Sequence, residues 1–153
     1  MLELYHWEPN GASARVLIGL EEKAIGYTSR YVDLLALEQF RPQFLRVEAT
    51  GEVPALVHDG AVLTGASPIC EYLEERFPAH ALMPCDARGR WQVRVWQKLV
   101  DDGFAASVSD LAWDAYGPSG SSPLARGVLD AEIAGIGSPE QRVVWQTARA
   151  AYG

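Results

Sequence analysis

Three short stretches of the sequence carry the groups that could do chemistry. Ser13 and Ser67 each stand at the start of a run predicted to be helical. The free N–H groups and the dipole of a helix start favour an anion, and a serine hydroxyl there can cap the helix or donate to that anion. Val53-Pro54 opens a predicted strand, where proline removes a ladder donor and requires an edge or a specialised conformation. The two helix starts favour a site for an anion, and Val53-Pro54 marks a specialised strand entry near it in the sequence.

The elements that would position these residues alternate between strands and helices. Apolar residues recur at helical spacing after Ser13. Asp59-Gly60 suits a type I′ turn between two short strands, which predicts a hairpin. Pro42 interrupts a weaker helical pattern, so a short or irregular helix is predicted there. The order is β-α-β-α-β-β-α, with strands predicted over 2–5, 28–32, 53–58 and 61–64 and helices over 14–24, 37–47 and 67–76.

The second half of the chain is predicted to be helical. A long helix is expected over 90–113, with Trp96, Val100 and Phe104 on one apolar stripe. A capping box with proline at the first helical position starts a last helix at 138. The predicted organisation is therefore an α/β domain over 1–78, a linker over 79–89 and a helical region over 90–153.

Composition excludes several classes of function. The net charge is −7 and no concentrated basic face is present, so nucleic-acid binding is not expected. His6, His58 and His80 match no zinc-ligand spacing, so no metal is expected. Cys70 and Cys85 form neither a CxxC motif nor a paired framework, which favours reduced thiols, with Cys70 a buried small hydrophobe.

Membrane insertion and secretion are not expected either. No apolar run approaches the roughly 20 residues that span a bilayer. The first ten residues lack the basic and apolar regions of a signal peptide. The sequence therefore favours a cytoplasmic protein.

Several motifs along the chain match the pattern of one known family. They are Asn10-Gly11-Ala12-Ser13, Gly51-Glu52-Val53-Pro54-Ala55-Leu56, Ile69-Cys70-Glu71-Tyr72-Leu73-Glu74, Arg94-Val95-Trp96 with Val100-Asp101, Pro139-Glu140-Gln141 and Trp145. With this order of elements the chain resembles the cytosolic glutathione S-transferase superfamily, and within it the bacterial glutathione-dependent β-etherases. The resemblance implies a thioredoxin-like N-terminal domain and an all-α C-terminal domain. That helical domain usually has five or more helices, so it is expected to be truncated here.

The resemblance implies that glutathione is the cosubstrate and that Ser13 stabilises its thiolate. A thiol with a pKa near 8.5 needs donors or positive potential to ionise, and the helix start supplies both. A plain N-cap role for Ser13 stays open, and Tyr5 is the alternative activating hydroxyl. The same resemblance implies that Val53 pairs with the cysteinyl backbone of glutathione beside a cis Pro54.

The glutamyl end of the implied site departs from the family pattern. An acidic residue and a serine usually stand where this chain has Gly65-Ala66, and Glu52 replaces a more usual glutamine. Ser67, with the helix start and the adjoining Ala66, could bind the ligand's carboxylate, or Ser67 could instead be an N-cap. Losing a charge-assisted contact costs roughly 1.5–3 kcal/mol, so weak glutathione binding is expected.

The leading functional hypothesis is a glutathione-dependent transferase or β-etherase-like enzyme that acts on an aromatic or hydrophobic electrophile. Trp7, Trp113 and Tyr116 are candidates for its substrate pocket, although aromatic residues at helical spacing are more often part of a core. The alternatives are a non-catalytic ligand-binding protein with a degenerate glutamyl site, and an enzyme that uses another thiol or an acyl carrier. The resemblance also implies a homodimer.

Overall fold

The chain divides into two compact units. The computed structural model describes residues 1–8, 11–34 and 36–104, with the single residues 134, 135, 139, 142 and 146. One unit consists of 1–32 and 53–109, and the other of 33–52 and 110–153. The domain boundaries predicted from the sequence stay a prediction.

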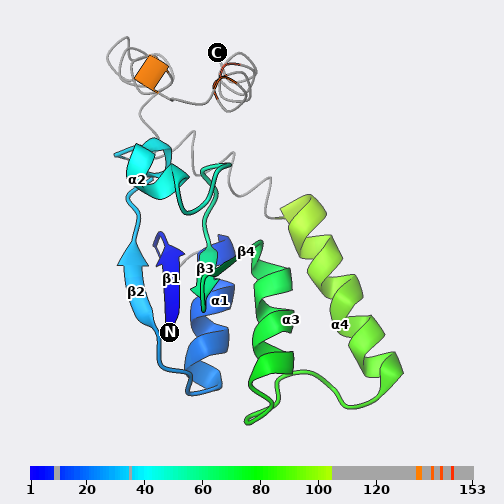
Figure 1. Ribbon diagram of the computed structural model, residues 1–153. Helices are drawn as coiled ribbons and strands as arrows, with labels where there is room; N and C mark the ends of the chain where they lie inside the picture. Colours follow the sequence, from blue (N-terminus) through cyan, green and yellow to red (C-terminus); the bar gives the residue numbers. More distant parts are fainter. Residues whose placement is uncertain are drawn as a thin grey trace. The chain divides into compact units, whose positions relative to one another are not determined.

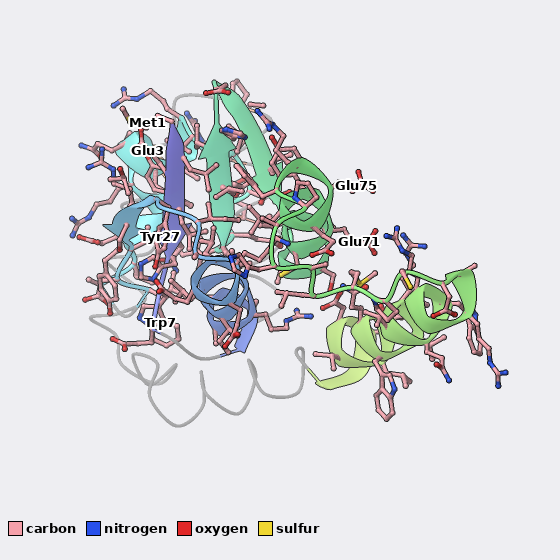
Figure 2. All side chains as sticks on the ribbon, turned by 90° about the horizontal axis from the view of Figure 1, so that it is seen from below. Met1, Glu3, Trp7, Tyr27, Glu71 and Glu75 are labelled. Carbon is pink, nitrogen blue, oxygen red and sulfur yellow. The ribbon has the colours of Figure 1, made fainter. Side chains whose placement is uncertain are left out.

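A four-stranded mixed sheet forms the centre of the first unit (Figure 1), in the order β2-β1-β3-β4. β1 pairs parallel with β2 and antiparallel with β3, and β3 pairs antiparallel with β4. Met1 and Trp7 flank β1 (Figure 2). The strands are β1 (Leu2–His6), β2 (Thr28–Tyr31), β3 (Ala55–His58) and β4 (Ala61–Thr64).

Two helices, α1 (Gly11–Glu22) and α3 (Ala66–Arg76), lie side by side against the sheet (Figure 1). Each contributes two fully buried residues one helical turn apart, which together with apolar residues of β1 and β3 form one core. The fully buried members are Leu4, Val16, Leu20, Leu56, Ile69 and Leu73. This β-α-β…β-β-α arrangement is thioredoxin-like, as the sequence predicts.

The local predictions for the hairpin and the irregular helix are confirmed. Asp59 and Gly60 have φ values of 49° and 85° between β3 and β4, as a type I′ turn requires. In the second unit, the segment interrupted by proline forms a 3₁₀ turn, η1 (Glu38–Phe40), and the short helix α2 (Pro42–Leu45).

The predicted starts of α1 and α3 are late by three residues and one residue. α1 begins at Gly11, so Ser13 is its third residue and not its N-cap. α3 begins at Ala66 with Gly65 as the N-cap residue, so Ser67 is not a cap either. Gly11 and Gly65 have φ values of 52° and 79°, in a region that glycine adopts at little steric cost. The chain can therefore enter each helix earlier than the serines indicate.

The long helix predicted over 90–113 begins three residues earlier, and residues 105–113 of it lie outside the described residues. α4 (Ala87–Leu99) begins after Asp86, whose carboxylate accepts a hydrogen bond from the Gly89 N–H, and ends in a π-helical segment, η2 (Val100–Phe104). Arg94 joins α4 to α3 by two hydrogen bonds of 3.1 Å to Glu71. Trp96 is 68% exposed. Most of the predicted last helix lies outside the described residues.

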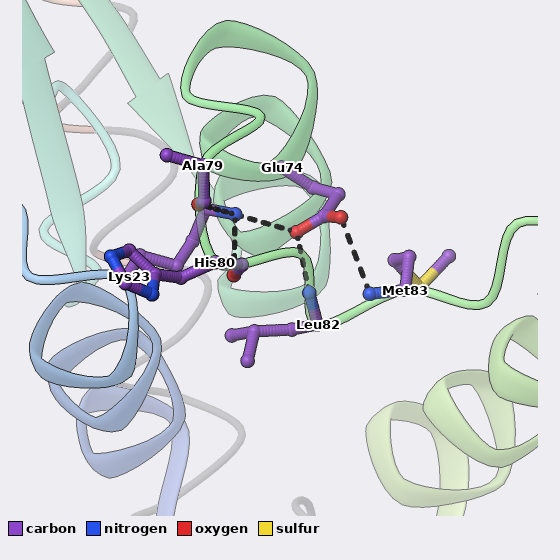
Figure 3. A network of polar contacts seen from close by, with 6 residues as sticks. All are labelled: Lys23, Glu74, Ala79, His80, Leu82 and Met83. Atoms are coloured by element: carbon purple, nitrogen blue, oxygen red, sulfur yellow. Dashed lines mark hydrogen bonds and ion pairs between the residues drawn. The ribbon is translucent and has the colours of Figure 1, made fainter.

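A buried ion pair connects α1, α3 and the segment that follows α3 (Figure 3). The Lys23 ammonium donates to Glu74 Oε2 at 2.7 Å and to the carbonyl oxygens of Ala79 and His80, both at 3.3 Å. Glu74 also accepts from the N–H groups of Leu82 and Met83. The Lys23 side chain is 1% exposed and that of Glu74 12%, so this pair is shielded from water.

Among the described residues, no helix is both long enough and apolar enough to cross a membrane.

Candidate functional site

The strand register brings the three chemically interesting stretches to one end of the sheet. Tyr5 lies opposite Ala55, and Ala55 lies opposite Thr64. The residues that follow β1, precede β3 and follow β4 therefore lie at the same end of the sheet. α1 and α3 both begin at this edge, because each follows its strand after a short connection (Figure 1).

Ser13 is placed to donate a hydrogen bond at this edge. Ser13 is only 4% exposed, and its Oγ accepts a hydrogen bond from the Trp7 N–H at 3.4 Å. Within the described part of the chain, its hydroxyl hydrogen has no acceptor. Because Oγ already accepts from the protein, the hydrogen can be directed to a ligand atom. The position in the first turn of α1 adds the positive end of the helix dipole.

The Val53 backbone is also unused. The Val53–Pro54 peptide bond is cis, which confirms the prediction. β3 begins only at Ala55, and the Val53 backbone forms no hydrogen bond with any described residue. Pro54 is buried and Val53 half-buried. A peptide-like ligand could therefore pair with the Val53 N–H and C=O, which is the role predicted for them.

A polar triad of Arg15, Ser67 and Asp101 lies at the start of α3. Arg15 donates to Ser67 Oγ at 3.1 Å and to Asp101 Oδ1 at 2.6 Å. Burial raises the pKa of Asp101, but hydrogen bonds from Ser67 and Arg15 and the Arg15 charge outweigh burial and lower it. The triad thus presents one cation, one anion and one hydroxyl beside Gly65-Ala66, where the sequence lacks the side chains that would bind the glutamyl end of the ligand.

The segment that carries these features also resembles a known family. Residues 12–76 match the family model described as the glutathione S-transferase N-terminal domain. Over these residues the chain is similar to that family. The first unit, which contains most of this segment, is called the transferase domain below; it includes Ser13, the Val53–Pro54 bond and the start of α3.

Known proteins extend the likeness beyond that domain. The protein LigF of Sphingobium sp. (strain NBRC 103272 / SYK-6) is 37% identical over 97% of this chain. The crystal structure of β-etherase LigF from that strain aligns with a TM-score of 0.78, 35% identity and 97% of this chain. A zeta-class glutathione S-transferase of Euphorbia esula is 41% identical over 56% of it. The chain spans 59% of the first protein's length and 38% of the last one's.

The remaining predicted site residues differ in what they can offer a ligand. The Ala66 methyl is part of the core, so only its backbone is available to a ligand. Glu52 belongs to the second unit and is exposed. Its N–H donates to the buried Glu48 carboxylate at 2.8 Å, and Thr50 binds the same carboxylate. Trp113 and Tyr116 lie outside the described residues.

Three further residues that the sequence analysis considered, Tyr5, Trp7 and Cys70, lie in the first unit. Tyr5 is a residue of β1, as expected. Trp7 Nε1 is buried without a hydrogen-bond partner among the described residues, so it is a second unused donor in the transferase domain. Cys70 is half-buried in α3, where burial raises the pKa of its thiol and Arg15 partly opposes this. Over the described ranges, no three His, Cys, Asp or Glu residues are grouped to hold a metal ion.

Sequence reasoning missed Arg15, Asp101 and Glu48 as structural parts of this region. Arg15 is the only charged residue in the first ten positions of α1, which is a usable signal. Asp101 stands in the Val100-Asp101 pair that supports the family resemblance, but nothing in the sequence indicates that it contacts Ser67. Glu48 gave no signal, because its partners are backbone and hydroxyl groups of its own loop.

Replacing Gly65 with alanine is expected to destabilise the transferase domain by about 1–3 kcal/mol. Gly65 has φ 79° and ψ 128°, and a Cβ there would lie 3.3 Å from Pro68 Cδ. Urea unfolding measures the change. Gly26→Ala is the matched control, because a Cβ at Gly26 has nothing within 4 Å. Equal changes in the two variants would show that the backbone of Gly65 carries no special constraint.

Proposed function

We propose that this chain supplies the glutathione-binding half of a glutathione-dependent transferase of the β-etherase type. The observation that carries the proposal is the Ser13 hydroxyl, which is buried at the start of α1 and accepts from the Trp7 N–H while its hydrogen has no acceptor among the described residues. A donor in that state stabilises an anion better than a hydroxyl whose hydrogen is already committed. The likeness to LigF supports the same class of reaction.

The residues fit glutathione at two of its three parts. Ser13 and the first N–H groups of α1 would lower the pKa of the thiol. The unpaired Val53 backbone would hold the cysteinyl peptide group, as an added strand pairs with a sheet edge. Bound glutathione supplies the nucleophilic sulfur, and the protein's part is to keep that sulfur ionised and oriented.

The third part, the γ-glutamyl end, would meet the triad of Arg15, Ser67 and Asp101. This end is a zwitterion, so its carboxylate matches the Arg15 guanidinium and its ammonium matches Asp101. Because these two side chains already bind each other at 2.6 Å, a ligand must compete with an existing ion pair. That competition supports weak binding, as the missing side chains at Gly65 and Ala66 also do.

The proposed substrate is an aromatic or hydrophobic electrophile such as an aryl ether. A C–S bond forms at the attacked carbon while its C–O bond breaks, and the aryl oxygen leaves with the electron pair and takes a proton from water. We also propose a cytoplasmic homodimer. Trp91, Trp96 and Leu99 of α4 are 62%, 68% and 57% exposed, which supports association with a second subunit.

A second candidate is a non-catalytic ligand-binding protein. The observation that favours it is the start of α3, where Gly65 has no side chain and the Ala66 methyl is buried in the core. In that case glutathione or a related peptide would bind without turnover.

One titration separates these functions. The chain is incubated with an aryl ether or an activated aromatic halide while the glutathione concentration is raised into the millimolar range. Saturable formation of the thioether supports the transferase and contradicts the binding protein. Saturable binding without product supports the binding protein. If neither occurs, both proposals are wrong, and activity with another thiol would indicate a different cosubstrate.

A further inference from the structure

The backbone of Trp7 is held on both sides of its Cα, in two successive peptide units, and both contacts bear on Ser13. On one side, the Trp7 N–H donates to Ser13 Oγ at 3.4 Å. On the other, the Trp7 carbonyl oxygen lies 2.6 Å from His6 Nδ1. The His6 carbonyl, which shares a peptide plane with the Trp7 N–H, accepts from the Val32 N–H at 2.8 Å and so ties that plane to the end of the sheet.

The partners of the His6 ring fix its tautomer. A carbonyl oxygen can only accept, so the 2.6 Å contact requires the hydrogen on Nδ1. In the neutral ring Nε2 is then an acceptor, and the Ser29 hydroxyl lies 2.7 Å from it. Both ring nitrogens are therefore used, and the ring cannot rotate without breaking a short hydrogen bond.

The sheet register explains why this arrangement forms. β1 and β2 are parallel with His6 opposite Tyr31, so Ser29, two residues earlier, lies on the same face of the sheet as Tyr31. The His6 ring meets the Tyr31 ring edge-on, with centroids 6.1 Å apart and planes at 84°. Tyr31 thus supports one side of the ring while Ser29 holds its far nitrogen.

We propose that His6 is a positioning residue for the Ser13 hydroxyl, acting through the Trp7 peptide. The Trp7 N–H lies in the His6–Trp7 peptide plane, and the Trp7 carbonyl belongs to the next one. The hydrogen bond from the His6 ring to that carbonyl closes a ring that contains the His6–Trp7 peptide, so it restrains the backbone rotations that set the direction of the Trp7 N–H. That N–H occupies an acceptor site of Ser13 Oγ and so leaves the hydroxyl hydrogen for the ligand. The inference deepens the proposed function, because its value to the enzyme rests on a thiolate bound at Ser13.

The first test uses the ligand-free chain and does not depend on glutathione. Nitrogen NMR of the His6 ring is expected to show the hydrogen on Nδ1. Hydrogen exchange at the Trp7 N–H is expected to accelerate about threefold to tenfold in His6→Ala, as befits one lost hydrogen bond. His6→Asn keeps an N–H near the Nδ1 position and is expected to retain the protection, whereas His6→Gln is expected to lose it.

The Asn and Gln variants serve as matched controls for each other if the alanine variant folds poorly. An Nε2–H tautomer, or equal exchange in both amide variants, would overturn the positioning role. The second test measures the ultraviolet absorbance of the thiolate in the glutathione complex against pH. His6→Gln, but not His6→Asn, is expected to move its midpoint upward. A wild-type chain that gives no thiolate signal would contradict the proposed function, and the exchange data would still decide the role of His6.

Discussion

Lys23→Met is expected to lower the free energy of unfolding by about 3–5 kcal/mol, the range for removing one partner of a buried ion pair. The methionine would leave the Glu74 carboxylate, which is only 12% exposed, without its cation. The carbonyl oxygens of Ala79 and His80 would lose their donor at the same time. Urea unfolding followed by circular dichroism measures the change.

Two further variants show whether burial is the cause. Lys98→Met removes an exposed lysine whose side chain is 76% accessible and whose partner Asp102 is 61% accessible, so no measurable change is expected. Lys23→Met combined with Glu74→Leu is expected to recover much of the loss, because no uncompensated charge remains. Similar losses in the two lysine variants, or no recovery in the double variant, would contradict the explanation.

The pH dependence of the same pair follows from Glu74. Burial raises its pKa, but hydrogen bonds from Lys23 and from the N–H groups of Leu82 and Met83 outweigh burial and lower it. A depressed folded-state pKa stabilises the protein above the unfolded value, near 4.3, and this stabilisation disappears as the pH falls through the folded value. The difference between wild type and Lys23→Met is therefore expected to shrink in acid.

Local patterns predicted most of the transferase domain because each pattern is decided by near neighbours. Asp59-Gly60 favours one turn type whatever surrounds it, and the spacing of Val16 and Leu20 requires a helix with one apolar face. The first residues of the helices were harder to predict from the sequence. Gly11 and Gly65 admit backbone angles that other residues avoid, so the chain turns before the serines that usually mark a cap.

Of the candidate site, the sequence predicted the backbone feature at Val53-Pro54 but not the contacts between side chains. Val53-Pro54 could be identified from two adjacent residues, and the cis bond is confirmed. The contacts of Ser67 with Arg15 and Asp101 join positions 52 and 34 residues away in the sequence, and only the packing of α1, α3 and η2 brings them together. The Lys23–Glu74 pair was missed for the same reason, since a lysine after a helix is usually a solvated residue.

Ser13→Ala is expected to lower kcat about tenfold to a hundredfold without abolishing activity, if the proposed transferase reaction is correct. A hydrogen bond to a charged group contributes about 1.5–3 kcal/mol, which converts to that range in rate. The pKa of the bound thiol is expected to rise by about one to two units for the same reason. Activity persists because the N–H groups and dipole of α1 do not depend on the side chain.

Ser67→Ala separates this effect from simple loss of a polar group at a helix start. Ser67 accepts from Arg15 and is placed at the proposed glutamyl end, so its loss is expected to raise the KM for glutathione and leave kcat nearly unchanged. Each variant needs a thermal unfolding curve, since Ser13→Ala also leaves the Trp7 N–H without its acceptor. A folded Ser13→Ala protein with no activity at all would show that the hydroxyl alone ionises the thiol. Unchanged kcat would assign that task to the helix start and leave Ser13 a structural anchor for Trp7.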